Sequence, residues 1–477
     1  MMRRVTFLLV LALLVAGSAF GQWQFVGLLP PGGVTPGDTL ETANIHGLAV
    51  DPAGKIWTMN YSAYARDTLQ ITDYLLKTIA GADSVLISKT IAVRALHIYN
   101  PNGTQASFSP IMVLTLPGSV KDTIGFWRYK GTLGLRYDPS NSPNTARGMR
   151  RDQNGNILAV YFGQIYRINY QTGAGMGKVV VDSANSLITP GVDASGNIFI
   201  TRVTGGGSAP VKIYNSSFSY LGNAKDTTTG FHRSIDVTPN GNDVYYADYT
   251  SHRFLRLHSS AGVLGTYTVR DTILKGFDCE SMDFNPKTHY FWASAGSYND
   301  MPNRYPGTTS GYTPGAWYAV DTGSLAIKDS LIWKFYTAAN VNERPRAIAF
   351  SVSGDTAYVG VFGSGSPVPG IRIYKKVATA VERVKGPEIP TGYDLQQNFP
   401  NPFNPSTQIT FTIAKAGATA LVVYDMLGRE IAVLMYETLQ PGTYKFHFDG
   451  SSFASGTYIY ELRSGDVRMT KKMVLVK

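Results

Sequence analysis

The chain has 477 residues, a formal net charge of +10, 12% aromatic and only 16% charged residues, with 49 glycines and 25 prolines. This length is too great for one ordinary core, so two folded domains are expected, and the turn-rich composition favours extracellular β structure over helical or disordered classes. The basic residues are scattered without an arginine- or lysine-rich block, which argues against a nucleic-acid partner and leaves weak attraction to anionic glycans open.

The N-terminus has the layout of a cleaved signal peptide. Arg3 and Arg4 precede an apolar stretch at residues 5–16, and small residues follow up to Gly21. The stretch is shorter than the ~20 apolar residues of a membrane-spanning helix. We therefore expect residues 1–21 to be removed and the mature chain to have no transmembrane span.

A repeated frame occupies the middle of the chain. Each copy has an apolar strand with a small residue at its second position, and most copies continue with a glycine-bearing turn and an aromatic or branched strand. The small residues are Gly47, Gly148, Thr189, Ser234, Ser281 and Ala347. Small side chains are needed where strands converge around a narrow axis, and three of the spacings match the ~40–50 residues of a four-stranded propeller blade.

This frame resembles the blades of NHL and gluconolactonase-like propellers over residues 22–376. We therefore predict an all-β chain with a β-propeller. Six blades are favoured, and seven are the alternative, with the extra blade drawn from residues 93–140. The strand at residues 24–28 is expected to close the ring by pairing with the segment at residues 371–374, which would cover two sheet edges.

The residues before the small positions form a second column. They are His46, Arg147, Ile188, Arg233, Glu280 and Arg346. If the strands share one direction, these side chains surround one mouth of the channel, where three arginines and a histidine outnumber one glutamate. Such a mouth could bind a carboxylate or sulfate group through forked guanidinium contacts. The alternative is that the charges pair with one another.

The resemblance also implies a second possible function, a lactonase or other hydrolase acting at the channel mouth. Related sites hold a divalent cation through several oxygen ligands. Here the column offers only Glu280 as an acid, because Asp236 and Asp283 lie further along their strands, and the arginines would repel a cation. We therefore predict no metal and no cofactor, name Glu280 as the catalytic residue if the protein is an enzyme, and leave activity open.

Two insertions and one cysteine complete this region. Residues 61–90 enlarge the first repeat, and long loops on a rigid scaffold often bind ligands, although a self-packed loop is an equal alternative. The second insertion, residues 297–318, carries aromatic residues suited to sugar rings or a protein partner: Tyr298, Tyr305, Tyr312 and Trp317. The lone cysteine, Cys279, is expected to be a buried structural thiol.

The C-terminal region has its own pattern. Residues 377–392 carry mixed charge, Pro387 and Pro390, and are expected to form a linker. From residue 393 onward, short strands alternate with glycine-containing turns, which predicts a β-sandwich. The expected strands are residues 408–413, 419–424, 430–435, 443–448, 457–463 and 468–476.

A proline- and asparagine-rich run opens this region. Its characteristic residues are Asn398, Pro400, Asn401, Pro402, Phe403, Asn404 and Pro405. The run resembles the start of the type A sorting domain of the type IX secretion system, an immunoglobulin-like sandwich, here at residues 393–477. The resemblance implies a Gram-negative bacterium, recognition by the type IX machinery, and export through the periplasm to the cell surface or medium. The predicted function is an exported propeller that binds a polysaccharide or surface protein, or acts as a scaffold.

Overall fold

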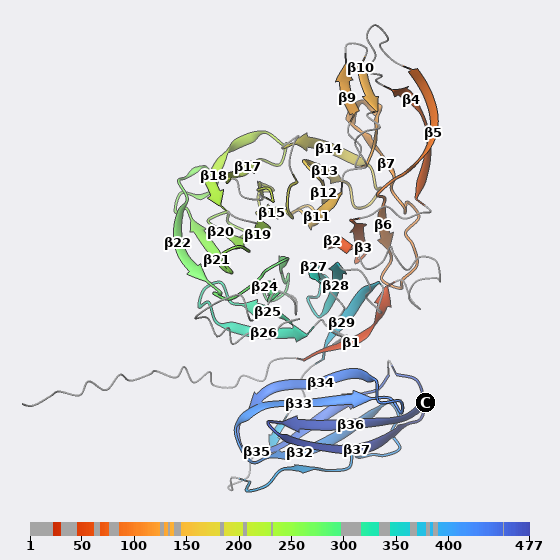
Figure 1. Ribbon diagram of the computed structural model, residues 1–477, viewed down its shortest axis with the longest axis vertical. Coiled ribbons are helices and arrows are strands. Elements are labelled where there is room, and N and C mark those ends of the chain that lie inside the picture. The colour runs from red at the N-terminus through yellow and green to blue at the C-terminus, as the bar shows by residue number, and fades with distance from the viewer. Residues whose placement is uncertain are drawn as a thin grey trace, which may run out of the picture. The chain divides into compact units, whose positions relative to one another are not determined.

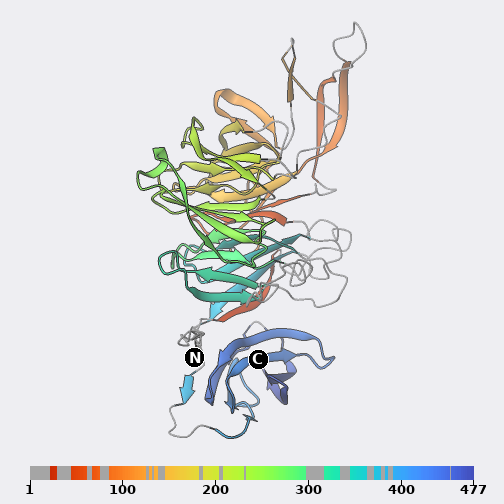
Figure 2. The same cartoon turned by 60° about the vertical axis from the view of Figure 1, so that its left-hand side comes forward.

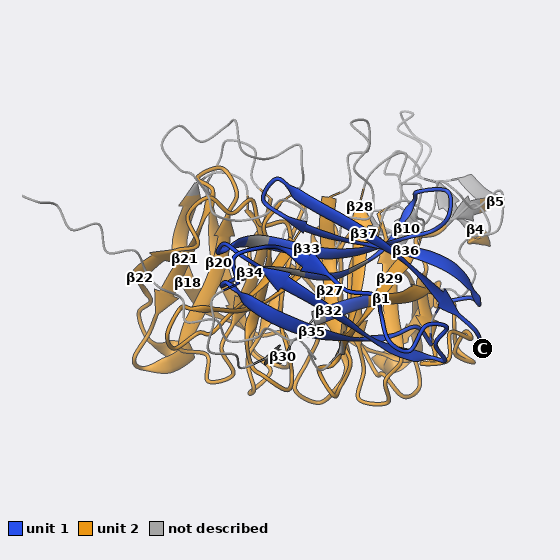
Figure 3. Cartoon of the chain, turned by 90° about the horizontal axis from the view of Figure 1, so that it is seen from below, with its two compact units in different colours: residues 1–24, 377–477 blue, residues 25–376 orange. Residues whose placement is uncertain are grey.

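The computed structural model describes most of the chain as β structure. The described residues are 22–29, 45–61, 67–75, 85–124, 128–131, 134–137, 145–181, 186–203, 208–229, 232–296, 316–332, 344–362, 370–377, 382–384, 390–451 and 453–477. Their helical content is two 3₁₀ turns, η1 (Pro117–Ser119) and η2 (Gly262–Leu264). Within these residues no helix has the length and apolar character needed to cross a membrane. The chain divides into two compact units, residues 25–376 and residues 1–24 with 377–477 (Figure 3).

The larger unit is built from antiparallel sheets that follow one another along the chain. Three of them are β2(Ile45–Val50)-β3(Ile56–Asn60)-β6(Leu96–Tyr99), β11(Ala146–Arg151)-β12(Ile157–Tyr161)-β13(Gln164–Ile168)-β14(Gly175–Val180) and β15(Gly191–Val192)-β16(Ile198–Ile200)-β17(Ser208–Tyr214)-β18(Tyr220–Thr229). The next three are β19(His232–Val237)-β20(Asp243–Asp248)-β21(Arg253–His258)-β22(Thr268–Ile273), β23(Met282–Phe284)-β24(Phe291–Ser294)-β25(Ala316–Val320)-β26(Ile327–Ile332) and β27(Arg344–Phe350)-β28(Thr356–Phe362)-β29(Ile371–Val377)-β1(Gln22–Leu29).

These sheets are arranged around a centre, as in a propeller. The first strands of the sheets lie near the centre and the last strands near the rim (Figure 1). Each first strand contacts the next one in chain order, and β27 contacts β2, so the circuit closes. The first strands coincide with the repeated frame of the sequence. The predicted closure of the ring is confirmed, because β1 pairs with β29 beside β28 and β27.

Residues between the first and second of these sheets add further strands. They form the sheet β5(Val85–Ala92)-β4(Thr68–Leu75)-β10(Gly134–Tyr137)-β9(Arg128–Gly131) and the hairpin β7(Val113–Leu116)-β8(Val120–Thr123). The sheet of β4, β5, β9 and β10 lies outside the ring (Figure 1). The segment proposed as an extra blade, residues 93–140, is thus divided among β6, the hairpin and this outer sheet.

The small residues of the frame lie where neighbouring first strands meet. A Cβ atom on Gly148 would lie 2.7 Å from the Cα atom of Thr189, in the segment leading to β15. A Cβ atom on Gly47 would lie 2.6 Å from the side chain of Met59 and 3.0 Å from that of Met149. These distances are shorter than van der Waals contact, so close approach of the strands requires glycine at both positions.

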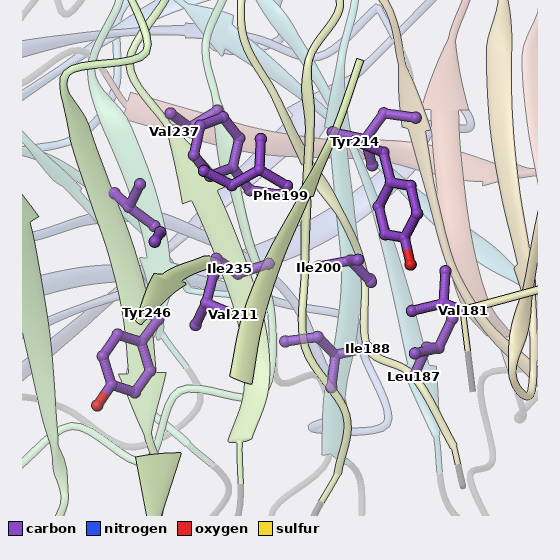
Figure 4. Close-up of a cluster of buried hydrophobic side chains, with 14 of the residues drawn as sticks. Val181, Leu187, Ile188, Phe199, Ile200, Val211, Tyr214, Ile235, Val237 and Tyr246 are labelled. Carbon is purple, nitrogen blue, oxygen red and sulfur yellow. The ribbon is translucent and has the colours of Figure 1, made fainter. Parts of the chain in front are cut away.

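Apolar side chains fill the space between adjacent sheets. One cluster includes Phe199 and Val211 from the sheet that begins with β15, and Ile235, Val237 and Tyr246 from the next sheet (Figure 4). Each of these side chains is almost fully buried, and burial of one such side chain stabilises the fold by about 1.5–3 kcal/mol. The inter-sheet cores therefore hold the first strands, and the residues on them, in fixed positions.

The smaller unit contains two four-stranded sheets, drawn in blue in Figure 2. They are β30(Glu382–Val384)-β35(Gly442–Asp449)-β32(Ser406–Ile413)-β31(Asp394–Leu395) and β34(Glu430–Leu439)-β33(Gly417–Tyr424)-β36(Gly456–Ser464)-β37(Val467–Leu475). Residues from both sheets share one apolar core, which includes Ile409, Phe411, Leu421 and Leu462. All six strands expected in this region are present, within a few residues of their predicted ends.

Candidate functional site

Bulges in the first strands position the predicted site residues. In β2, Ile45 pairs with Asn60 and Gly47 pairs with Met59, so His46 is an extra residue without a partner. The same irregularity places Arg147 between the paired residues of β11 and Arg346 between those of β27. In β19 a register shift falls between His232 and Ile235 and includes Arg233. A bulge redirects a side chain relative to the regular alternation of a strand, and bulges are common beside functional sites.

The redirected side chains come together around His46. His46 is buried, and its pKa is held well below its usual value, first by burial and then by the positive charges of Arg346, Arg147 and Arg233. Three arginines from three different sheets therefore surround this imidazole closely enough to keep it neutral. Four members of the predicted column are thus brought together, and their position at one mouth of the channel stays a prediction.

Glu280 lies between the arginines and balances part of their charge. It lies two residues before the start of β23, its backbone N–H donates to the Ser294 Oγ atom over 3.0 Å, and its side chain is fully buried. The carboxylate forms a short ion pair with Arg346 and longer ones with Arg344, at 3.7 Å, and Arg233, at 3.8 Å. Glu280 therefore holds arginines from β19 and β27 in one cluster.

Arg344 was missed by the sequence analysis. It lies two residues before Arg346 at the start of β27, outside the repeated column, and joins the cluster only because its guanidinium reaches Glu280. No spacing rule of the frame identifies it. Only the packing of β27 beside β23 brings it to the site.

Aromatic rings support the arginines. The guanidinium of Arg147 lies 5.3 Å from the ring centre of Tyr61, that of Arg346 lies 5.3 Å from Phe362, and that of Arg233 lies 5.6 Å from Tyr249. These distances are typical of cation–π contacts. Tyr61, Tyr249 and Phe362 stand at or just after the end of the second strand of their sheets, 15 or 16 residues after a column residue. This repeated aromatic position is a signal in the sequence that identifies the rings beside the arginines.

The cluster carries an excess of positive charge. We call Arg147, Arg233, Arg344, Arg346 and Glu280 the basic cluster; it has four guanidinium groups and one carboxylate. Burial lowers the pKa of Arg346 to about 10, so this residue remains charged at neutral pH, and burial also lowers the pKa of Arg147 below its usual value. Arg147 forms no ion pair with any residue that the structure describes. Both sequence hypotheses hold in part: Glu280 is paired, and positive charge remains.

The other candidate residues lie elsewhere. Ile188, the apolar member of the column, is buried beside β15. Trp317 lies on β25, opposite Ser294, and its side chain is fully buried inside the larger unit, so it cannot serve as the surface ligand contact that was expected. Tyr298, Tyr305 and Tyr312 lie outside the described residues.

Cys279 behaves as the sequence predicted. Its thiol is buried, and burial raises its pKa well above the usual value. The sulfur atom lies 3.1 Å from the carbonyl oxygen of Ser281, to which it can donate. A thiol that stays protonated in the interior is a packing element and not a nucleophile.

The proline- and asparagine-rich run is bound to the strands of the smaller unit. Asn398 is buried, and its amide donates to the Pro400 carbonyl and the Thr407 hydroxyl, each over 3.0 Å. Phe403 is buried, and its backbone exchanges hydrogen bonds with Val474 and Val476 near the end of β37. The run and the last strand are therefore parts of one folded element.

Comparison with known proteins identifies the smaller unit. Residues 397–477 match the family model described as a secretion system C-terminal sorting domain. None of the curated proteins compared with this chain matches it.

Solved structures resemble the larger unit only distantly. A calcium-binding protein, regucalcin, from Agrobacterium tumefaciens str. C58 has 13% identity and a TM-score of 0.42, over 74% of this chain and 94% of that one. Chaetomium thermophilum Raptor has 9% identity and a TM-score of 0.39, over 77% and 30%. A chain of the mitotic checkpoint complex has 5% identity and a TM-score of 0.40, over 74% and 96%. Such scores are too low to carry an argument about function.

The matched region shows where the protein is sent. The matched region contains the buried Asn398 and Phe403 together with the final strand β37. Residues 397–477 correspond to a sorting domain that engages the type IX secretion machinery, and the protein is exported by that system to the cell surface or extracellular space.

Proposed function

We propose that this protein is an exported binding protein whose larger unit takes up an acidic polysaccharide at the basic cluster. The observation that carries this proposal is the excess of guanidinium groups held around one buried carboxylate. Arg147 stacks on Tyr61 and has no ion-pair partner among the described residues, so its charge can be neutralised by a ligand. A carboxylate or sulfate group on a sugar chain would supply that charge.

The geometry suits such a ligand in two ways. Guanidinium groups bind carboxylate and sulfate oxygens through paired N–H donors. Aromatic rings such as Tyr61 and Tyr249, which are next to the arginines, can pack against the apolar faces of sugar rings. Glu280 acts as a positioning residue in this proposal, because its ion pairs keep Arg233, Arg344 and Arg346 in place.

We also propose an architecture for each of the two units. The larger unit is a six-bladed propeller, which is supported by the closed circuit of contacts from β2 through β11, β15, β19, β23 and β27 back to β2. The smaller unit is an immunoglobulin-like sandwich, supported by its two sheets around one core. The proposed boundaries are a signal peptide at residues 1–21, the propeller at 22–376, a linker at 377–392 and the sorting domain at 393–477.

The surroundings of Glu280 favour binding over catalysis. A general base must reach its substrate, and a metal ligand must tolerate a cation beside it. Glu280 is fully buried and forms ion pairs with three arginines. A hydrolase that uses Glu280 is therefore the second candidate, and it predicts lactone hydrolysis that is lost in Glu280→Gln.

Binding of an acidic oligosaccharide tests the proposal. The exported protein would be titrated with oligogalacturonate and with a neutral galacto-oligosaccharide of the same length. We expect the acidic ligand alone to bind, with an affinity that falls as salt is added. Arg147→Gln should weaken binding by about tenfold, since a hydrogen bond to a charged group contributes about 1.5–3 kcal/mol.

A matched control separates local charge from net charge. Arg270→Gln removes the same charge from a side chain that is half exposed on the outer strand β22. Binding should be unchanged in this variant. Equal binding of the acidic and neutral ligands, or equal effects of the two substitutions, would contradict the proposal.

A further inference from the structure

A second group of charged residues lies further along the same first strands. Three residues beyond the bulge column, the frame carries Ala49, Arg150, Gly191, Asp236, Asp283 and Ala349. Three of these positions are occupied by alanine or glycine. The three charged side chains belong to β11, β19 and β23, and they meet across the space that the small residues leave open.

Arg150 joins Asp236 and Asp283, and we call these three residues the Arg150 group. Its guanidinium forms a short ion pair with the Asp283 Oδ1 atom and lies 3.2 Å from the Asp236 Oδ2 atom. The remaining donors reach backbone carbonyls: Nε donates to Pro190 and Nη2 to Met282, both over 3.0 Å. All three nitrogens of this guanidinium are therefore engaged, and it has little capacity left for an anionic ligand.

A cavity of about 230 Å³ opens onto this group. Its lining consists of strand residues and of residues from the ends of the strands and the turns after them, such as Asn285, His289 and Thr322. Of these three, His289 is exposed and Thr322 is partly exposed, whereas Asn285 is buried. Val192, Val237, Phe284 and Phe350 supply apolar walls. An apolar cavity of ~150 Å³ can take up benzene, so this space suits a ligand somewhat larger than benzene.

One carboxylate oxygen in the cavity is unused. Asp283 Oδ1 accepts from Arg150 and, over 2.9 Å, from the backbone N–H of Phe284. No described residue donates to Asp283 Oδ2 or forms an ion pair with it. The Asp283 side chain is 21% exposed, whereas the Asp236 side chain is 4% exposed. The open oxygen of Asp283 is therefore the acceptor that a ligand can reach.

The charges at the bottom of the cavity do not cancel. Arg150 contacts both carboxylates, so one negative charge remains on the group at pH 8, above the raised pKa of Asp236, which is about 7. Arg151 also lines the cavity, where it is partly exposed, donates to the Val50 carbonyl over 3.1 Å and by its charge opposes the rise in the pKa of Asp283 that burial causes. A partly exposed charge is screened by water and balances a buried carboxylate weakly.

We propose that this cavity binds a small organic ammonium ion with an apolar body. The ammonium group would donate to Asp283 Oδ2 and neutralise the remaining charge of the aspartates. The apolar body would contact Val192, Val237, Phe284 and Phe350, and the two phenyl rings can also attract the cation. This inference is independent of the proposed function, because it concerns other residues and the opposite ligand charge.

Three probes of similar size test the charge and shape of the ligand. Benzylamine, benzyl alcohol and benzoate would be titrated calorimetrically into the exported protein at pH 8. We expect benzylamine to bind at least about tenfold more tightly than benzyl alcohol, because a hydrogen bond between charged groups is stronger than one to a hydroxyl group. Benzoate should not bind. Equal affinities for the amine and the alcohol, or no binding of benzylamine, would overturn the proposal.

Substitutions test the location. Asp283→Asn replaces the open acceptor by a donor and should weaken benzylamine binding by about tenfold or more. Asp271→Asn is the matched control, since Asp271 also pairs with an arginine, Arg256, but lies on the outer strand β22. It should leave binding unchanged.

A third variant keeps the test decisive if Asp283→Asn does not fold. Thr322→Trp places a large side chain in the partly exposed lining of the cavity without altering Arg150 or the aspartates, and should prevent binding of benzylamine. Unchanged binding in Thr322→Trp, or in a folded Asp283→Asn protein, would contradict the assignment. Arg147→Gln should not affect benzylamine, so failure at this cavity remains distinguishable from failure at the basic cluster.

Discussion

The basic cluster and the Arg150 group use the same first strands for opposite purposes. At the basic cluster, bulges place several arginines around Glu280, so positive charge is in excess. Three residues further along, Asp236 and Asp283 surround Arg150, so negative charge is in excess once Asp236 is ionised, above about pH 7. One repeated scaffold can therefore present different charges at two positions along its first strands, because each position gathers side chains from several sheets.

The basic cluster and the Arg150 group also differ in the strand pairing that positions their side chains. The basic cluster depends on irregular pairing, since a bulge must redirect each side chain. The Arg150 group depends on regular pairing, because Met149 to Arg151 face Ala159 to Ile157 without interruption. Substitutions should therefore disturb the basic cluster and the Arg150 group to different extents.

Loss of the central carboxylate should have the largest effect. Glu280→Gln leaves buried arginines without their counter-charge, and breaking a buried ion pair in this way costs about 3–5 kcal/mol. The free energy of unfolding in urea should fall by this amount. Replacing Arg346 by Met in the same chain should recover part of the loss. A decrease below about 1 kcal/mol would show that the carboxylate does not hold the cluster together.

Enlarging a small position should have the next largest effect. Gly148→Val places a side chain against the backbone of Thr189, and overpacking of this kind costs about 1–3 kcal/mol. Urea unfolding measures the change. The control is Gly417→Ala, because no atom lies within 4 Å of the added Cβ. Equal stability of the two variants would argue against close convergence of the first strands.

The free energy of unfolding should depend on pH through Asp236 in the Arg150 group. Burial raises the pKa of Asp236 from 3.8 to about 7, against the opposing effect of Arg150. The folded state then binds a proton more tightly than the unfolded state, so this group stabilises the fold at low pH and loses that contribution as pH rises from 4 to 7.

Asp236→Asn should remove this dependence. We expect the wild type to lose on the order of 1–2 kcal/mol relative to the variant between pH 5 and pH 7.5. His46 has a lowered pKa and therefore stabilises the fold as pH rises. This opposite contribution is the same in the wild type and the variant, so it cancels when the two are compared. Parallel pH profiles of the two proteins would rule out titration of Asp236 in this range.

The smallest effect concerns an aromatic support at the basic cluster. Tyr61→Leu removes the ring beneath Arg147 and should weaken oligogalacturonate binding by about 0.5–1 kcal/mol, the usual size of a cation–π contact. Tyr220→Leu, at an exposed position on β18, is the control. A larger loss in the control would show that Tyr61 does not support the site.

The sequence alone was sufficient for the repeated frame, the closing strand and the sorting domain. Periodic apolar residues, small residues at a fixed position and glycine turns are local features, and they predict strands wherever they occur. The run from Asn398 to Pro405 could be identified for the same reason, since its prolines and asparagines are consecutive in the chain. These features required no knowledge of distant contacts.

Tertiary structure decided how the charges are used. Arg344 joins the site from outside the repeated column, and Arg150 reaches aspartates 86 and 133 residues away in the sequence. Trp317, chosen from its loop-like surroundings, is instead buried on a strand. Such outcomes depend on which side chains meet across the channel and on where a bulge redirects a strand. Both are set by contacts between residues far apart in the chain, which local patterns do not record.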